Sequence, residues 1–189
     1  MERKIDPQRK EQLTSFLEKY GIDTKIWGEG ATKTVELLME ELDKGEAMLS
    51  VTEEGNLLRV LNSLCVNIRH RTSDGKIFIL EEERQEFQNG QSRKRVYLNG
   101  SVAGKIEKGE TPEEAARREL LEELKIPFEG ALELEAETVS LRESQSYPGL
   151  TTQYNLSIFA MEMPAEYFKS EGYIEVQDRV TTYFGWKQV

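Results

Sequence analysis

Cysteine and histidine are nearly absent from this chain, which restricts the chemistry open to it. The 189 residues include a single cysteine, Cys65, and a single histidine, His70. One cysteine excludes an internal disulfide and a multi-cysteine zinc site, and it fits a reducing compartment. Because Cys65 lies in the apolar run LNSLCVNI, we expect a buried structural thiol. For His70 we expect a place on a strand surface and no role as a catalytic base.

Long apolar runs and an excess of positive charge are absent as well. No run approaches the roughly 18 residues of a membrane helix, and the charged start MERKIDPQRK differs from a signal peptide, so we expect a cytoplasmic protein without a membrane partner. The chain has 25 basic and 35 acidic residues, a net charge of -10. Bulk charge therefore does not favour nucleic acid as a partner. A phosphate-rich ligand would need a local basic patch or a metal ion.

The first 46 residues carry two helical patterns. Asp6 and Pro7 predict the start of a helix and Gly21 its end, and an apolar stripe at i, i+3, i+4 and i+7 lies between them. A similar stripe runs from about Thr32 to Lys44. We predict a two-helix extension at residues 1–46, which packs on the core or forms a homodimer, followed by the main domain at residues 47–189. A role of the extension in substrate selection stays open.

From about Asn56 the pattern changes to strands. The segments LLRVLNSLCVNIRH and GKIFIL are predicted strands joined by a turn at Asp74 and Gly75, and the polar EEERQEFQNGQSRKR after them is predicted to be an exposed loop. Further strands are predicted at RVYLNGSVAG, ALELEAETVSL and QYNLSIFAMEM. A helical turn is predicted from Pro164 to Phe168, and TTYFGWKQV is predicted to be a final strand or a docked tail. Strands on both sides of an acidic helix predict a mixed α/β sheet.

That acidic helix lies in the segment GKIEKGETPEEAARRELLEELKI, from Gly104 to Ile126. On a helical wheel of about 100° per residue, Glu122 lies roughly 60° to one side of Glu119 and Glu123 about 40° to the other. Three carboxylates therefore share one face. Because like charges at this spacing repel, the arrangement favours a hard cation with oxygen ligands, Mg²⁺ or Mn²⁺, over that face.

The spacing of this segment resembles the Nudix box. Gly104 is followed after five residues by Glu110, and after seven more by the run Arg118-Glu119-Leu120-x-Glu122-Glu123. One position departs from the family pattern, because Lys125 replaces the final glycine before an aliphatic Ile126. That glycine ends the helix, so its replacement concerns the exit turn more than the carboxylates.

The resemblance implies an α/β/α sandwich that hydrolyses a nucleoside diphosphate linked to another group. It implies that Glu119, Glu122 and Glu123, together with the Gly104 carbonyl, bind Mg²⁺ or Mn²⁺, and that Arg118 and Glu110 form a structural ion pair. Glu107 is a further candidate ligand. Water attack at phosphorus needs charge neutralisation and a positioned water. The general base is either one of the box glutamates or a downstream carboxylate such as Glu143.

The substrate is less well defined by the sequence. Basic residues precede the box and would suit a second phosphate: Arg69, Arg71, Arg84, Arg93, Lys94 and Arg95. Tyr147, in the loop Tyr147-Pro148-Gly149, is a second kind of candidate, since family members acting on ADP-ribose carry a proline-containing loop after the box. We expect a small phosphoanhydride substrate, first a nucleotide sugar such as ADP-ribose. Dinucleoside polyphosphates, nucleoside triphosphates and inositol pyrophosphates stay open, as does a non-catalytic nucleotide-binding regulator.

Overall fold

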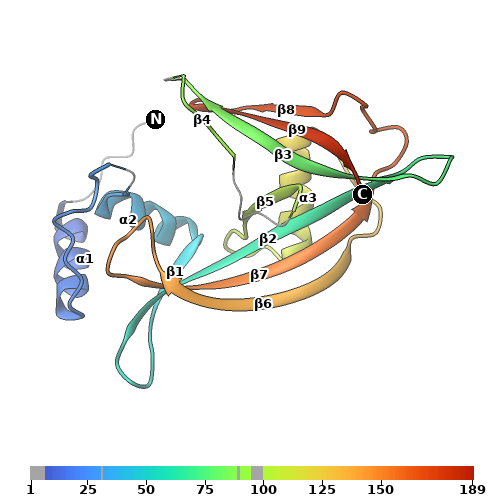
Figure 1. Cartoon of the computed structure of the whole chain (residues 1–189). Coiled ribbons are helices and arrows are strands. Elements are labelled where there is room, and N and C mark those ends of the chain that lie inside the picture. The colour runs from blue at the N-terminus through green and yellow to red at the C-terminus, as the bar shows by residue number, and fades with distance from the viewer. Residues whose placement is uncertain (1–6, 31, 89, 95–99) are drawn as a thin grey trace. The chain divides into compact units, whose positions relative to one another are not determined.

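A computed structural model describes residues 7–30, 32–88, 90–94 and 100–189 of the chain (Figure 1). The described helices are α1 (Pro7–Lys19), α2 (Val35–Lys44) and α3 (Pro112–Leu124). The described strands are β1 (Ala47–Val51), β2 (Leu57–Arg71), β3 (Ile77–Phe87), β4 (Ser92–Arg93), β5 (Val102–Lys105), β6 (Glu133–Glu143), β7 (Thr151–Glu162), β8 (Tyr173–Val176) and β9 (Val180–Gln188). None of these helices is long and apolar enough to span a membrane.

The strands form one hydrogen-bonded sheet in the order β6-β7-β2-β3-β9-β8, and β1, β4 and β5 pair at its sides. Most pairs are antiparallel, including β2 with β3 and β3 with β9. Strands β2 and β7 run parallel, because Asn155 contacts Asn62 while Met163 bonds to Arg69, so the positions rise together along both strands. The predicted fold class, a mixed sheet with helices, is confirmed.

The chain divides into two compact units. Unit 1 contains residues 1–62 and 138–155, and unit 2 contains residues 63–137 and 156–189. The predicted boundary between residues 46 and 47 falls inside unit 1, and the two-helix extension stays a prediction as a separate domain.

Unit 1 holds α1 and α2, which form for the reasons predicted from their apolar stripes. Gly45 ends α2 in the left-handed region at φ 72°, and Thr34 caps its start, two residues later than the predicted Thr32. The predicted cap residue Asp6 lies outside the described residues. A buried hydrophobic cluster of this unit combines side chains from both helices, from the segment between them and from later segments: Leu17, Ile22, Trp27, Val35, Leu38, Leu57, Tyr147 and Leu150.

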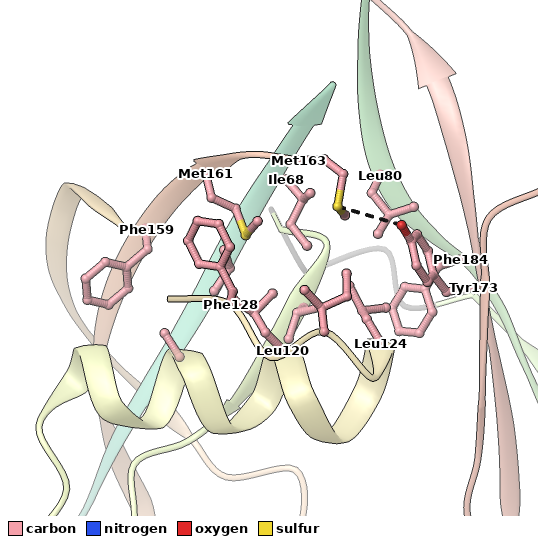
Figure 2. Close-up of a cluster of buried hydrophobic side chains, with 14 of the residues drawn as sticks. Ile68, Leu80, Leu120, Leu124, Phe128, Phe159, Met161, Met163, Tyr173 and Phe184 are labelled. Carbon is pink, nitrogen blue, oxygen red and sulfur yellow. Dashed lines mark hydrogen bonds between the residues drawn. The ribbon is translucent and has the colours of Figure 1, made fainter. Parts of the chain in front are cut away.

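Unit 2 holds α3, whose apolar side packs against sheet residues. Figure 2 shows Leu120 and Leu124 of α3 facing Tyr173 and Phe184, and the Tyr173 hydroxyl lies 3.7 Å from the sulfur of Met163. Burying such side chains stabilises a unit by about 25 cal/mol per Å² of apolar surface. This core fixes the height and rotation of α3 over the sheet.

The structure corrects the prediction of an exposed loop at EEERQEFQNGQSRKR. Strand β3 continues to Phe87, where it pairs with Val180 of β9, and it turns back into β4. Glu82 and Gln85 on this stretch are buried. The polar composition concealed a strand because its inward side chains are polar. Strands β1 and β8 were also missed, whereas the predicted turn at Gly75 is confirmed, with φ 84°.

Candidate active site

Helix α3 begins with a complete capping box. The Thr111 hydroxyl accepts a hydrogen bond from the Glu114 N–H at 3.2 Å, and a Glu114 carboxylate oxygen accepts one from the Thr111 N–H at 2.8 Å. Pro112 occupies the first turn, where it costs no backbone hydrogen bond. This capping box fixes the start of α3, and the carboxylates after it are held on a defined helix.

Lys125 ends the helix in the left-handed region, with φ 61° and ψ 34°. Among the described residues it is the one non-glycine residue with positive φ. Its N–H donates to the Leu121 carbonyl at 3.1 Å, and its ammonium donates to the Glu122 carbonyl at 2.8 Å. The exit turn thus keeps the conformation that glycine favours, at a cost of about 1 kcal/mol for a residue with a Cβ atom.

Arg118 ties the helix to the loop that precedes it. Its Nε and Nη2 atoms donate to the two carboxylate oxygens of Glu110 at 2.7 and 3.0 Å, and Nη2 also donates to the Lys105 carbonyl at 2.9 Å. Glu110 in turn accepts from the Glu107 N–H at 2.9 Å. The Arg118 guanidinium lowers the pKa of Glu110. The ion pair that the resemblance implied is present, in the bidentate form that gives the strongest charge-assisted bonds.

The remaining nitrogen of Arg118 faces the acidic side of the helix. Its Nη1 atom lies 2.8 Å from Glu119 and 3.4 Å from Glu122. Burial raises the pKa of Glu119, opposed by Arg118 and assisted by the nearby carboxylates of Glu122 and Glu175. The Glu122 side chain is 58% exposed, whereas that of Glu119 is 13% exposed. Glu123 is buried. The face therefore combines enclosed carboxylates with one that solvent reaches.

Gly104 lies directly against this face. It sits on β5, opposite Leu64 of β2. A Cβ atom at Gly104 would lie 1.9 Å from a carboxylate oxygen of Glu119, far inside contact distance. The lack of a side chain at Gly104 thus allows the Glu119 carboxylate to pack directly against the backbone of β5.

Buried Glu175 was missed by sequence reasoning. It lies on β8 near enough to Glu119 to raise the pKa of that carboxyl, and its carboxylate accepts a hydrogen bond from Gln177 at 2.6 Å. In the run Tyr173-Ile174-Glu175-Val176 the residues facing inward are Tyr173 and Glu175, while Ile174 and Val176 are exposed. The hydrophobicity of Ile174 and Val176 would predict that these two residues face inward, so the sequence pattern does not indicate that Glu175 is buried.

The predicted substrate residues of unit 2 lie in different surroundings. Arg69 pairs with Glu135 at 2.6 Å, and Arg71 is exposed at the end of β2. Arg95 lies outside the described residues. His70, whose ring stacks on Phe168 with centroids 3.8 Å apart, belongs to an aromatic cluster.

Two further candidates belong to unit 1. Tyr147 is fully buried, with its ring 5.0 Å from that of Trp27 and below the guanidinium of Arg59. These contacts are those of a core residue. Glu143 accepts a hydrogen bond from the Gly149 N–H at 2.9 Å, so its carboxylate holds the loop in which Tyr147 lies.

The donor set on α3 fits a divalent cation. Carboxylates of Glu119, Glu122 and Glu123 together with a backbone carbonyl are oxygen ligands, which Mg²⁺ and Mn²⁺ prefer. Within the part of the chain that the structure describes, no three acidic, histidine or cysteine side chains already stand in a metal-holding arrangement. Glu119 and Glu122 are both directed toward Arg118. Rotation of the exposed Glu122 side chain would release it from that contact.

Comparison with known proteins identifies the family. A family model described as the NUDIX domain matches residues 63–166, more than half of the chain, and the chain belongs to this family. It is thus a Nudix hydrolase, a class of enzymes that acts on small phosphoanhydrides and generally uses divalent metal ions. No curated protein sequence shows significant similarity to it.

Solved structures give only remote likenesses. An Ap4A hydrolase of C. elegans is 16% identical, with 67% of this chain and 77% of that chain covered and a TM-score of 0.37. A dihydroneopterin triphosphate pyrophosphohydrolase of E. coli is 19% identical, with 68% and 79% covered and a TM-score of 0.39. A Nudix hydrolase of M. Smegmatis, RenU, is 18% identical, with 62% and 69% covered and a TM-score of 0.32.

Proposed function

We propose that this Nudix hydrolase cleaves a nucleoside diphosphate linked to another moiety, in a reaction that depends on Mg²⁺ or Mn²⁺. A nucleotide sugar such as ADP-ribose is the first substrate to test. The observation that carries the proposal is the packing of Glu119 against Gly104, which places the backbone of β5 beside the acidic face of α3. A side chain at residue 104 would destroy that contact.

In this proposal the metal is held by the carboxylates of Glu119, Glu122 and Glu123 and by the Gly104 carbonyl. When bound, the ion would neutralise charge on the phosphate oxygens and lower the pKa of a coordinated water. The chain supplies an oxygen donor set and a helix fixed at both ends. Glu107, whose side chain is exposed, remains a proposed additional ligand.

We propose that Arg118 and Glu110 hold α3 and the loop before it in a fixed relative position. Their bidentate pair and the bond to the Lys105 carbonyl involve Nε and Nη2. The Nη1 atom, which contacts Glu119 and Glu122, is separate from those bonds. Both carboxylates can therefore exchange Arg118 for a cation while the loop stays attached.

We place the general base among the box glutamates. The alternative, Glu143, already accepts a hydrogen bond from Gly149 across its own loop. That bond favours a role in loop structure. A box carboxylate would accept the proton directly from the attacking water, and proton transfer of this kind contributes about two to four orders of magnitude to a rate.

The test is a hydrolysis panel in which products are separated chromatographically with Mg²⁺ or with EDTA. The panel contains ADP-ribose, a dinucleoside polyphosphate, a nucleoside triphosphate and an inositol pyrophosphate. Metal-dependent products from ADP-ribose support the full proposal, and products from another member replace the substrate. Tight nucleotide binding with no products from any member would instead indicate a regulator.

A further inference from the structure

The basic residues that precede the box are not equivalent in the structure. Arg84 lies on one face of β3, where it pairs with Glu86 at 2.8 Å and covers the ring of Tyr183 at 3.8 Å. Arg93 faces the opposite way. Its Nε atom donates to the Gln85 side-chain oxygen at 2.9 Å, and Gln85 is only 5% exposed.

Arg93 is one end of a row of side chains that crosses four strands. The paired positions are Arg93 of β4, Gln85 of β3, Thr182 of β9 and Glu175 of β8. Residues paired across antiparallel strands share a face of the sheet. The bulge between Glu82 and Arg84 brings Gln85 onto the same face as Glu82. At about 4.8 Å between strands, the row measures roughly 14 Å along the sheet.

The inner part of this row is buried and polar. Gln85 donates to the Thr182 hydroxyl at 3.4 Å, and Thr182 is 1% exposed. Glu175 follows at 8% exposure. Gln85 thus accepts from Arg93 on one side and donates to Thr182 on the other, which fixes the plane of its amide. A buried amide held at both ends orients the Nε edge of the Arg93 guanidinium.

The far end of the row reaches the acidic face of α3. Strand β8, which carries Glu175, contacts α3, and Glu175 contributes to the raised pKa of Glu119. Tyr173, two residues before Glu175 on the same side of β8, packs in the core with Leu120 and Leu124 of α3 (Figure 2). The row therefore connects Arg93 with the box carboxylates inside unit 2.

A surface pocket lies at the Arg93 end. It is shallow and open to solvent, has a volume of about 420 Å³, and is lined by Phe87, Gln91, Ser92 and Arg93. The Arg93 guanidinium lies over the Phe87 ring, 5.1 Å from its centroid. The ring supports the arginine from below, and the Nε edge is held by Gln85. A guanidinium carries five N–H donors in a fixed fork, so one held in this way presents further donors to an anion.

We propose that this pocket binds a phosphate group of the substrate other than the one under attack, with Arg93 as the residue that recognises it. That the phosphate belongs to a substrate rests on the proposed function. That the ligand is a phosphate follows from the residues of the pocket themselves. The Arg93 guanidinium, held in one orientation beside the polar residues Gln91 and Ser92, fits a phosphate. A chain of net charge -10 needs such a local cation to bind a phosphate. Polyphosphorylated substrates gain most from it.

Phosphate binding is testable without hydrolysis. Inorganic tripolyphosphate, which has no base or sugar, is titrated by calorimetry into the full chain in EDTA and at low salt. Arg93→Met is expected to weaken binding at least about tenfold, the loss typical of a charge-assisted contact. Arg84→Met is the matched control, since it removes a cation from the opposite face of the neighbouring strand, and its effect is expected to stay within about twofold. Arg93→Lys keeps the charge without the fork and should fall between.

Several outcomes would overturn the assignment. Equal losses in both methionine variants would show a general charge effect, and no loss in Arg93→Met would remove the site. Competition of adenosine with tripolyphosphate, abolished by Phe87→Leu, would make the pocket a base site. If the panel gives products, Arg93→Met should raise KM with little change in kcat. A chain that hydrolyses nothing yet loses tripolyphosphate binding in Arg93→Met would refute the enzyme proposal and keep the phosphate site.

Discussion

Two arginine–carboxylate clusters in this chain differ in how far they are closed to solvent. The buried cluster in unit 1 consists of Arg59, Glu41, Lys33 and Tyr147. Arg59 and Glu41 are directly hydrogen-bonded with side chains 4% and 6% exposed, and Lys33 contacts Glu41 at 2.6 Å. Tyr147 lies beneath Arg59, and its pKa is raised by burial and by Glu41.

The helix cluster in unit 2 consists of Arg118, Glu110, Glu119 and Glu122. Its arginine is 23% exposed, and one of its carboxylates, Glu122, is 58% exposed. Arg118 pairs with three carboxylates, whereas in the buried cluster one carboxylate, Glu41, pairs with both Arg59 and Lys33. A matched buried pair is costly to open. In the solvent-exposed helix cluster, which has more carboxylates than cations, a carboxylate can exchange Arg118 for a metal ion. We therefore propose a catalytic role for the helix cluster and a structural role for the buried cluster.

The largest expected effect is the loss of turnover in the helix cluster. Glu122→Gln should lower metal-dependent turnover by about two to four orders of magnitude, because a main electrostatic catalyst is removed. Metal-free thermal stability should be unchanged or slightly higher, since a repelling carboxylate becomes neutral. Glu113→Gln, also exposed on α3 and paired with Arg117, is the control and should keep its turnover. Wild-type turnover of Glu122→Gln at saturating Mg²⁺ would remove Glu122 from the site.

The second effect is a loss of stability in the buried cluster. Glu41→Leu leaves Arg59 buried without its matching charge and should cost about 3–5 kcal/mol in the free energy of unfolding. Trp27 belongs to the same core, so its fluorescence in a Trp186→Phe background reports urea unfolding of unit 1. Glu36→Gln, which removes a partly exposed partner of Lys10, should cost less than about 1 kcal/mol. Similar costs for the two variants would show that the buried pair contributes no more to stability than a partly exposed one.

A smaller effect concerns pH. Arg118 lowers the pKa of Glu110 in the folded chain, so ionised Glu110 stabilises the fold above its unfolded pKa of about 4.3, and this stabilisation is lost as the pH falls through the lowered value. Glu110→Gln should cost about 1 kcal/mol at pH 7 and progressively less below pH 4. Urea unfolding at both pH values measures it. A cost that stays constant with pH would show that the charge of Glu110 is irrelevant.

The smallest effect is expected at the end of α3. Lys125→Gly relieves the left-handed backbone at φ 61° and should stabilise unit 2 by about 0.5–1 kcal/mol, partly offset by a more flexible unfolded chain. Trp186 fluorescence in a Trp27→Phe background provides the measurement. Turnover should be unchanged, because no carboxylate is touched. Destabilisation would mean that the Lys125 ammonium bond to the Glu122 carbonyl outweighs the backbone strain.

The sequence predicted the local features of the helix cluster well. Thr111, Pro112 and the glutamate spacing act within one or two turns, so the start of α3 and its acidic face were visible. The replacement of the final box glycine by Lys125 predicted an altered turn at the end of α3. The hydrogen bonds of Lys125 to neighbouring carbonyl groups nevertheless hold the left-handed turn that glycine favours. Local hydrogen bonds of this kind follow directly from residue order.

Features that depend on strand pairing were not predicted. Gln85 and Glu175 are buried polar residues that pair with Thr182 on strand β9, which lies about a hundred residues after Gln85 in the sequence. No local pattern encodes that register. The burial of Tyr147 was not predicted either, because the turn-like sequence Tyr-Pro-Gly does not indicate a ring packed in a core. The division into two units likewise depends on residues 138–155 joining the N-terminal segment.

Mn²⁺ binding followed by electron paramagnetic resonance tests the contrast between the clusters most directly. Free Mn²⁺ is measured while the full chain, Glu122→Gln and Glu41→Leu are titrated at low temperature, with folding checked by circular dichroism. We predict that the full chain and Glu41→Leu bind Mn²⁺ alike and that Glu122→Gln binds it at least about tenfold more weakly. Unchanged binding in Glu122→Gln, or binding lost in a folded Glu41→Leu protein, would contradict the assignment of the metal to α3.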